Sequence, residues 1–203
     1  MRIRNLLITL TTCLIASRSV AQNDENQYAK YRPFAIYAGV GPGFFFNNVV
    51  TFKDDVNPWG YQFSFRFMWE PKASFLSLGF ETGYYRIYSA SSNVLTALSP
   101  EPIPVKVTNS IVPLLFIVSM KFSKEFYASW SMGQSIKYNI IDAPNNPYDL
   151  NSHTVSLADF AATVGYRFKQ KERISYAVEF KGFYSSKYAN GTIALLFIAG
   201  FRL

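Results

Sequence analysis

Cysteine and histidine are almost absent from this chain of 203 residues, which contains one of each, Cys13 and His153. A single cysteine cannot close an intrachain disulfide, and one histidine is too few for a zinc site of the usual kind. The one glycine-rich stretch, Gly39-Val40-Gly41-Pro42-Gly43, does not match a phosphate-binding loop because no helix is expected after it. We therefore expect no metal site and no cofactor.

The amino terminus has the three parts of a secretory signal. Arg2 and Arg4 form a basic start, and Leu6–Ala16 is an apolar segment too short to span a bilayer. Ser19-Val20-Ala21 has the small residues of a cleavage site. These features predict a signal peptide over residues 1–21.

After the predicted signal, long apolar runs and runs of basic charge are also scarce. The longest apolar run, Ile111–Val118, is shorter than the roughly 20 residues that a membrane-spanning helix needs. The signal carries Cys13, three arginines and no acidic residue, so its removal lowers the formal net charge from +7 to +4. Because the remaining Lys and Arg residues are scattered, we expect no nucleic-acid partner.

Aromatic residues, in contrast, are abundant: 19 Phe and 14 Tyr contribute most of the aromatic fraction of 18%. From Trp59 to Trp69 every odd-numbered residue is a large aromatic, and most even-numbered residues are small or polar. An alternation of period two predicts a β-strand, because successive side chains leave opposite faces. A face made only of aromatic side chains fits a strand between lipid and a polar interior, so we predict a transmembrane β-barrel.

Eight segments have the roughly 9–11 residues that a tilted transmembrane strand needs. They are Phe34–Gly43, Trp59–Trp69, Phe75–Tyr88, a stretch within Val105–Phe122, Phe126–Tyr138, Thr154–Phe168, Ile174–Tyr184 and Thr192–Leu203. We therefore predict an all-β fold, an eight-stranded antiparallel up-and-down transmembrane β-barrel. A barrel of ten strands is the alternative.

The connections between these segments alternate in length. The long ones are Asn47–Pro58, Ser89–Pro104 and Asn139–Ser152, and the short ones are Glu70–Ser74, Ser123–Glu125 and Lys169–Arg173. Short periplasmic turns and long outer loops are typical of outer-membrane barrels. The alternation predicts the outer membrane of a Gram-negative bacterium with both termini in the periplasm. Residues 22–32 are then a periplasmic lead-in, and residues 33–203 form the barrel domain.

The alternation also assigns strand residues to the lipid or to the lumen. The aromatic residues predicted to face lipid include Trp59, Tyr61, Phe63, Phe65, Phe67, Trp69, Trp130, Phe197 and Phe201. The charged residues predicted to face the lumen are Arg66, Glu81, Asp159, Arg167, Glu179, Lys181 and Arg202. The interior of an eight-stranded barrel is just wide enough for its own side chains, and buried charges must pair. We expect a salt-bridged plug, with a narrow channel or a proton path as the alternative.

Three features have a second, functional interpretation. Pro113 lies in a strand that is apolar on both faces, and it predicts a β-bulge where a partner or lipid could pack. The proline-rich connections, Ser89–Pro104 above all, have residues suited to partner recognition as well as to ordinary loops. His153 lies near Ser152 and Asp159, but their spacing fixes no catalytic triad. We predict no catalytic residues.

With the strands placed, the chain resembles the superfamily of small outer-membrane β-barrels, which includes the OmpA transmembrane domain and OmpX. More closely, it resembles the PorT-type outer-membrane barrel family. The matching segments are Val20-Ala21-Gln22, Ala38-Gly39-Val40-Gly41, Val112-Pro113-Leu114-Leu115 and the closing Phe197–Leu203. The resemblance implies insertion by the barrel assembly machinery, which reads a last strand ending in an aromatic residue. Here the last residue is Leu203, with Phe201 two positions before it.

These observations together predict a non-enzymatic outer-membrane barrel that acts through its outer loops or its lipid face. Its role would be that of a structural or adhesive surface protein, or of an accessory subunit of a secretion or uptake complex. The expected partners are outer-membrane lipid, the barrel assembly machinery and such a complex. A narrow channel for small solutes and a lipid-modifying enzyme are the alternatives.

Overall fold

The computed structural model describes residues 32–46, 56–71, 74–96, 99–143, 151–170, 173–188 and 190–203. The predicted signal peptide and all but the last residue of the predicted lead-in lie outside these ranges. Within them, no helix has both the length and the apolar character to cross a membrane.

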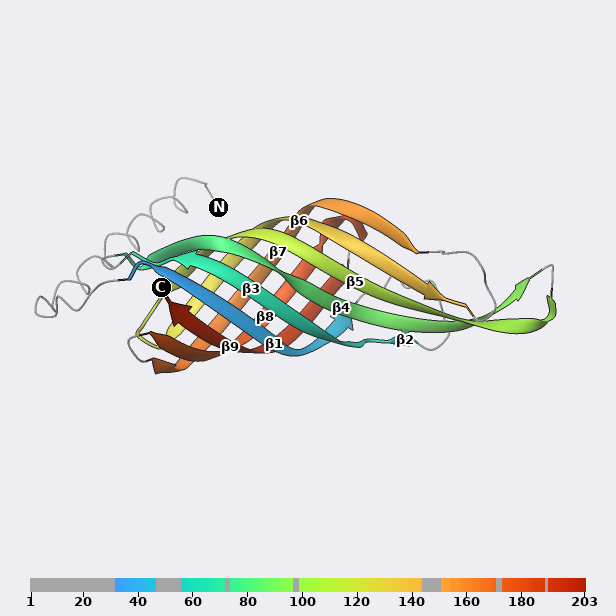
Figure 1. Ribbon diagram of the computed structural model, residues 1–203, viewed down its shortest axis with the longest axis horizontal. Helices are drawn as coiled ribbons and strands as arrows, with labels where there is room; N and C mark the ends of the chain where they lie inside the picture. Colours follow the sequence, from blue (N-terminus) through green and yellow to red (C-terminus); the bar gives the residue numbers. More distant parts are fainter. Residues whose placement is uncertain are drawn as a thin grey trace, which may run out of the picture.

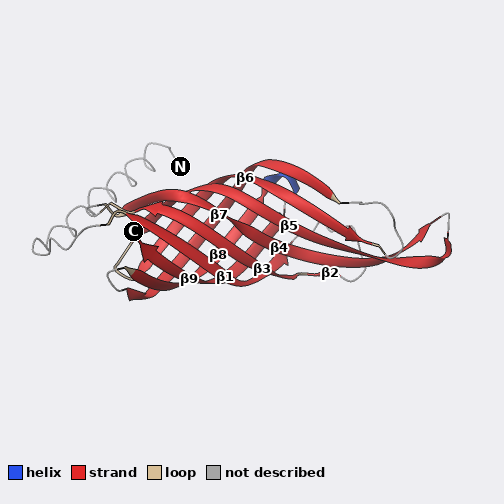
Figure 2. Ribbon diagram, in the orientation of Figure 1, coloured by secondary structure: helices blue, strands red, loops and turns tan. Residues whose placement is uncertain are grey.

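Strands make up almost all of the described chain, together with one short 3-10 helix, η2 (Ser186–Tyr188) (Figures 1 and 2). The strands are β1 (Phe34–Phe46), β2 (Val56–Asn57), β3 (Trp59–Trp69), β4 (Leu76–Thr96), β5 (Ser99–Lys121), β6 (Phe126–Asp142), β7 (Ser152–Gln170), β8 (Ile174–Ser185) and β9 (Asn190–Arg202). The start of β1 and the end of β9 lie at the same end of the molecule (Figure 1).

The sheet closes on itself. Apart from the two-residue β2, each strand pairs antiparallel with the next strand in sequence, so that β1 lies beside β3, and β9 pairs with β1. Both β2 and β3 pair with β4, and only Pro58 separates them, so β2 continues the line of β3. The wall of the barrel therefore has eight strands. The predicted eight-stranded antiparallel barrel is confirmed, and the ten-strand alternative is wrong.

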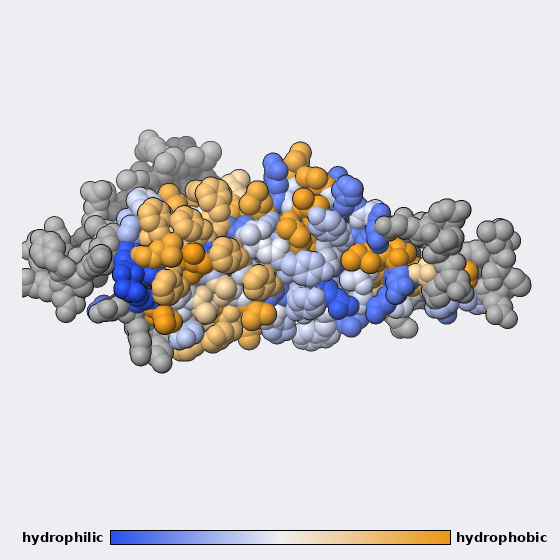
Figure 3. All heavy atoms as spheres, viewed as in Figure 1, coloured by the Kyte–Doolittle hydropathy of each residue, from blue (hydrophilic) through white to orange (hydrophobic). Residues whose placement is uncertain are grey.

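Alternation along each strand separates a polar interior from an apolar exterior. In β3 the even-numbered Gln62, Ser64, Arg66 and Met68 are buried, whereas all of its aromatic residues are exposed. On the face shown in Figure 3, apolar side chains gather in a band near the end where β9 terminates, and hydrophilic side chains cover the adjoining rim. A sheet of this pattern has its apolar face toward hydrocarbon.

The β4–β5 hairpin differs from the predicted long loop Ser89–Pro104. β4 and β5 have 21 and 23 residues, compared with 11 in β3, and they remain paired as far as Thr96 and Ser99. The hairpin projects beyond the other strands at the end opposite the carboxyl terminus (Figure 1). The prediction that Ser89–Pro104 is a loop is wrong, because most of this segment is paired strand. Prolines signal loops, but an edge strand accepts a proline whose missing N–H faces away from its partner.

Pro113 does not produce the predicted bulge. The β4–β5 pairing is interrupted between Thr82–Leu114 and Tyr85–Ile111, while the β5–β6 pairing continues through Pro113–Ser135 without a shift. The missing N–H of Pro113 therefore lies on the side of β4. The two register shifts in this pair of strands lie elsewhere: one is in β4, between Arg86 and Tyr88, and the other is near the tip of the hairpin, between Val94 and Thr96.

The lumen is filled by side chains in layers. One apolar cluster contains Ala35, Tyr37, Met68, Ile117, Tyr127, Ala177, Ala194, Leu196 and Ile198. A second apolar cluster, toward the projecting hairpin, contains Phe45, Tyr85, Ile87, Ile111, Leu115, Ala161 and Phe183. The charged residues of the interior lie among these layers, so the sequence-predicted interior is polar only in part.

Two inward tyrosines each lie against a glycine of the next strand. Tyr37 is paired with Gly200, and a Cβ on Gly200 would lie 2.3 Å from a ring carbon of Tyr37. Tyr127 is paired with Gly165 in the same way, with a distance of 2.2 Å. Because no real Cβ makes so short a contact, glycine is required for these rings to lie flat on the neighbouring strand.

Candidate functional site

The seven charged residues predicted to face the lumen lie on the inner face or at its rim. Buried among them are Arg66, Glu81, Asp159, Arg167, Glu179 and Lys181, whereas Arg202 is partly exposed. They do not form one network. The structure groups them with other polar side chains into a central cluster, a rim cluster and a separate site at Asp159.

The central cluster consists of Arg66, Glu81, Glu179 and Lys181, from β3, β4 and β8. Arg66 Nε donates to Glu81 Oε2 at 2.7 Å, and Arg66 Nη1 donates to Glu179 Oε1 at 2.6 Å. Lys181 Nζ forms an ion pair with Glu81 Oε1. Two cations face two anions, all of them buried, and this balance is what makes buried charge tolerable.

Two tyrosines fix the orientation of the carboxylates in the central cluster. The Tyr127 hydroxyl donates to Glu179 Oε1 at 2.6 Å, and the Tyr85 hydroxyl donates to Glu81 Oε1. Lys181 Nζ also donates to the Tyr85 hydroxyl at 2.6 Å. Tyr127 belongs to the first apolar cluster and Tyr85 to the second, so these hydrogen bonds connect the charged residues to both apolar clusters.

The rim cluster is centred on Glu70, which follows β3 directly at the end of the barrel that holds both β1's start and β9's end. Its Oε1 accepts from the Tyr37 hydroxyl at 2.6 Å. Its Oε2 accepts from Lys121 Nζ at 3.0 Å and from Arg202 Nη2 at 2.9 Å. Arg167 Nη2 lies 3.9 Å from Glu70 Oε1 and 3.4 Å from the Tyr37 hydroxyl.

The charges around Glu70 decide its ionisation. Burial alone would raise the pKa of the Glu70 carboxyl. The Lys121 ammonium, the hydrogen bond from Tyr37 and the Arg167 guanidinium act in the opposite direction, and the pKa lies below its ordinary value. Glu70 is therefore ionised in the folded protein at neutral pH.

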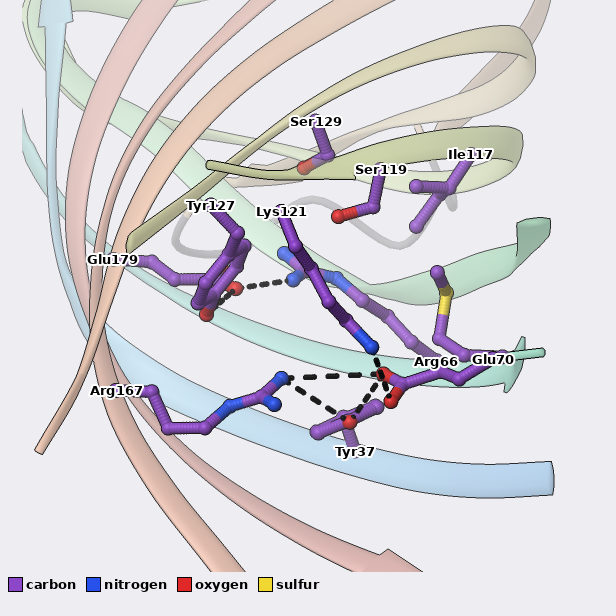
Figure 4. Close-up of a pocket in the computed structure, with 11 residues that line it drawn as sticks. Tyr37, Arg66, Glu70, Ile117, Ser119, Lys121, Tyr127, Ser129, Arg167 and Glu179 are labelled. Carbon is purple, nitrogen blue, oxygen red and sulfur yellow. Dashed lines mark hydrogen bonds and ion pairs between the residues drawn. The ribbon is translucent and has the colours of Figure 1, made fainter. Parts of the chain in front are cut away.

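A cavity of about 30 Å³ separates the central cluster from the rim cluster (Figure 4). Its polar lining includes Arg66, Glu70, Tyr127, Arg167 and Glu179. A polar cavity needs roughly 10–15 Å³ to hold one water molecule, so this space suits one or two waters and no larger solute. At this level the lumen is closed by its own side chains.

Asp159 lies apart from both clusters, in a site made of neutral donors. It accepts hydrogen bonds from Ser156 Oγ at 2.6 Å, from Ser135 Oγ and from the Ser186 backbone N–H at 3.1 Å. Both Ser156 and Asp159 face inward because β7 has one extra residue opposite Gln134 of β6. The predicted salt-bridged plug thus involves six of the seven named residues, while Asp159 is held by hydroxyl groups.

The structure brings no catalytic triad together at His153. His153 is exposed at the start of β7, whereas Asp159 is fully buried and already bound by two serines. In the described ranges, no three His, Cys, Asp or Glu side chains are placed to hold a metal ion.

Four further residues belong to the site and were not predicted from the sequence: Glu70, Lys121, Tyr37 and Tyr127. Glu70 was assigned to a short turn, although it continues the even-numbered inward face of β3. Lys121 likewise continues the odd-numbered inward face that contains Ile117 and Ser119. Extending the alternation one residue past Trp69 would have found Glu70, and following it to the end of the predicted segment Val105–Phe122 would have found Lys121.

The projecting hairpin is the other candidate site, and its two edges differ. Successive N–H groups of an antiparallel strand point alternately to its two neighbours. Because the missing N–H of Pro113 lies toward β4, the even-numbered Pro104, which is in the same regular register, has its own on the side away from β4. Among the described residues, nothing pairs with β5 on that side before Lys106. Pro104 thus removes a donor from this edge and opposes strand addition there.

Comparisons with known proteins agree with the fold. No family model matches the chain, and no curated protein matches it. Among solved structures, it is similar to Ail, the attachment invasion locus protein of Yersinia pestis, with a TM-score of 0.53, 7% identity, and coverage of 85% of this chain and 100% of Ail. It is also similar to Neisserial surface protein A, with a TM-score of 0.50, 10% identity, and coverage of 84% and 97%. At these identities the likeness shows the fold, that of the small outer-membrane β-barrels, and the PorT-type resemblance stays a prediction.

Proposed function

We propose that this protein is a non-enzymatic outer-membrane barrel of a Gram-negative bacterium, which binds a macromolecular partner through the projecting β4–β5 hairpin. The observation that carries the proposal is the contrast between a closed lumen and an extended hairpin. A closed lumen leaves the outer surface as the place where the protein can act.

The filled interior supports a binding role over transport. The central cluster and the second apolar cluster lie across the lumen, and the cavity beside the central cluster has room for one or two waters only. Moving these charges to admit a solute would break buried ion pairs, which costs about 3–5 kcal/mol for each partner removed.

The hairpin supports partner binding because it exceeds what the barrel wall requires. A transmembrane strand needs roughly 9–11 residues, whereas β4 and β5 have 21 and 23. On its outer edge, Pro104 disfavours nonspecific pairing with other strands. The hairpin projects at the end of the barrel opposite the carboxyl terminus (Figure 1), and the long connections of such barrels lie outside the cell. This arrangement supports placing both termini in the periplasm.

The partner belongs either to another surface, as in adhesion, or to a complex in the same membrane. The similar structure of Ail is that of a protein named for attachment and invasion, which supports the first possibility. The accessory-subunit role predicts a stoichiometric protein partner in the same outer membrane.

The test compares the full chain with a variant in which Ser92–Val105 is replaced by Asn-Gly, which joins the paired residues Ser91 and Lys106 by a two-residue turn. Lys124→Ala, in the exposed turn at the other end, serves as the control. Each protein is produced in its native outer membrane and tested for cell attachment and, after mild detergent extraction, for bound proteins by mass spectrometry.

We expect attachment, or one stoichiometric partner, with the full chain and the control, and its loss with the shortened hairpin. All three proteins should retain the heat-dependent gel mobility of a folded barrel. Retention of attachment and partner by the shortened variant would contradict the proposed role of the hairpin.

A further inference from the structure

The lipid-facing surface has an open groove, whose floor is formed by small residues of β7 and β8. Gly182 and Ala162 are directly paired across the two strands and point outward. Trp130, Phe160, Tyr184 and Phe46 surround them and complete a groove of about 220 Å³. The Trp130 and Phe160 rings lie 6.1 Å apart and form one wall.

Gly182 is not explained by crowding, unlike the glycines beneath Tyr37 and Tyr127. A Cβ at Gly182 would meet only the carbonyl oxygen of Ala162, at 4.0 Å, which is an ordinary contact. Glycine in a strand costs roughly 0.5–1 kcal/mol relative to alanine, so its presence without a steric reason calls for another cause. The structure offers one such cause: a side chain at position 182 would enter the groove, and glycine leaves it open.

The surroundings of the groove identify its occupant. Residues next to it on the outer face, such as Phe180 and Leu195, are exposed apolar side chains of the lipid-facing band. The groove is continuous with the surface that meets hydrocarbon, and it is larger than the roughly 150 Å³ apolar cavity that holds a benzene molecule. An apolar groove in this position faces lipid chains and not water.

We infer that the groove over Gly182 and Ala162 is a binding site for one acyl chain of a membrane phospholipid, held more tightly than the lipid around it. An acyl chain in the groove makes dispersion contacts with rings on both of its sides. An acyl chain on the convex surface elsewhere contacts the protein on one side only. The site depends on the membrane location proposed above and is independent of the hairpin.

The test is native mass spectrometry of the full chain, reconstituted with palmitoyl-oleoyl phosphatidylglycerol and released from mild detergent. Gly182→Leu and Ala162→Leu fill the groove from its two sides. Val164→Leu, which is also outward on β7 and is not part of the groove lining, is the control. We expect one lipid per wild-type barrel and per control barrel, and a bound fraction at least about tenfold lower in each filled variant.

Equal lipid retention in wild-type and filled variants, or no retention in any of them, would overturn the inference. So would a lipid-free dimer of the wild-type chain that dissociates in the filled variants, because a second copy would then cover the groove. Heat-dependent gel mobility confirms folding, and either leucine variant alone suffices if the other fails to fold. The shortened-hairpin variant should retain the lipid, so the two proposals fail separately.

Discussion

Because two cations face two anions in the central cluster, we expect charge balance, more than any single ion pair, to stabilise the barrel. Arg66 is 6% exposed, and its partners Glu81 and Glu179 are 1% exposed. Arg66→Met leaves two carboxylates with the one cation of Lys181, and breaking a buried pair in this way costs about 3–5 kcal/mol. The equilibrium constant for unfolding should rise roughly a hundred- to a few thousand-fold.

Removing a matched pair should cost much less. In the double variant Arg66→Met/Glu179→Gln, the ion pair between Lys181 and Glu81 remains and the cluster stays neutral. Replacing a buried ion pair by uncharged groups is often close to neutral, so we expect the double variant to be more stable than the sum of the singles by about 2 kcal/mol or more.

The contrasting variant is Arg66→Met/Lys181→Met, which removes two cations and leaves two buried carboxylates uncompensated. It should be less stable than either single variant. Urea unfolding in lipid vesicles, followed by tryptophan fluorescence and gel mobility, measures all of them. If the neutral and the charged double variants were equally destabilised, packing rather than charge balance would govern the interior, and the reasoning would be refuted.

Three further predictions follow from other parts of the barrel. Glu70→Gln should lower the folding stability by about 3 kcal/mol at pH 7. Because the folded pKa of Glu70 is lowered, this difference from wild type should be present above the unfolded pKa of about 4.3 and vanish as pH falls through the folded value. Unfolding curves that showed the same difference at pH 7 and at pH 3 would contradict this prediction. Gly165→Ala should lower the folding stability by about 1–3 kcal/mol, because the alanine Cβ meets the Tyr127 ring, and by much less in a Tyr127→Ala background. An equal loss of stability in both backgrounds would exclude this contact as the cause. Pro104→Val should restore an N–H donor on the outer edge of β5 and produce dimers or larger assemblies in light scattering. A monomer as stable as wild type would show that Pro104 does not protect this edge.

The alternation of the strands made most of the fold predictable. Hydrocarbon outside and side chains inside impose period two on every strand, so Trp59–Trp69 could be assigned to one face residue by residue. The aromatic residues predicted to face lipid, from Trp59 to Phe201, are all exposed. The same regularity predicted which charges point inward.

The pairing of those charges could not be predicted, because it depends on register and closure. Arg66 lies beside Glu81 on the neighbouring strand, but its second partner, Glu179, is on β8, far across the sheet order. Register shifts add to the difficulty: one extra residue in β7 brings Ser156 and Asp159 to the same face. Turn signals were also misleading where Pro100 and its neighbours are part of a paired strand.

The central claim is that the lumen is closed, and conductance measures this most directly. Purified full-length protein, reconstituted into planar lipid bilayers under a transmembrane voltage, should insert as a folded barrel and show no stable ion conductance. Arg66→Met/Glu179→Gln, which keeps the cluster neutral, should be equally silent. Steady single-channel currents from the wild-type protein, altered by neutralising Arg66 or Glu81, would contradict the account and establish the barrel as a channel.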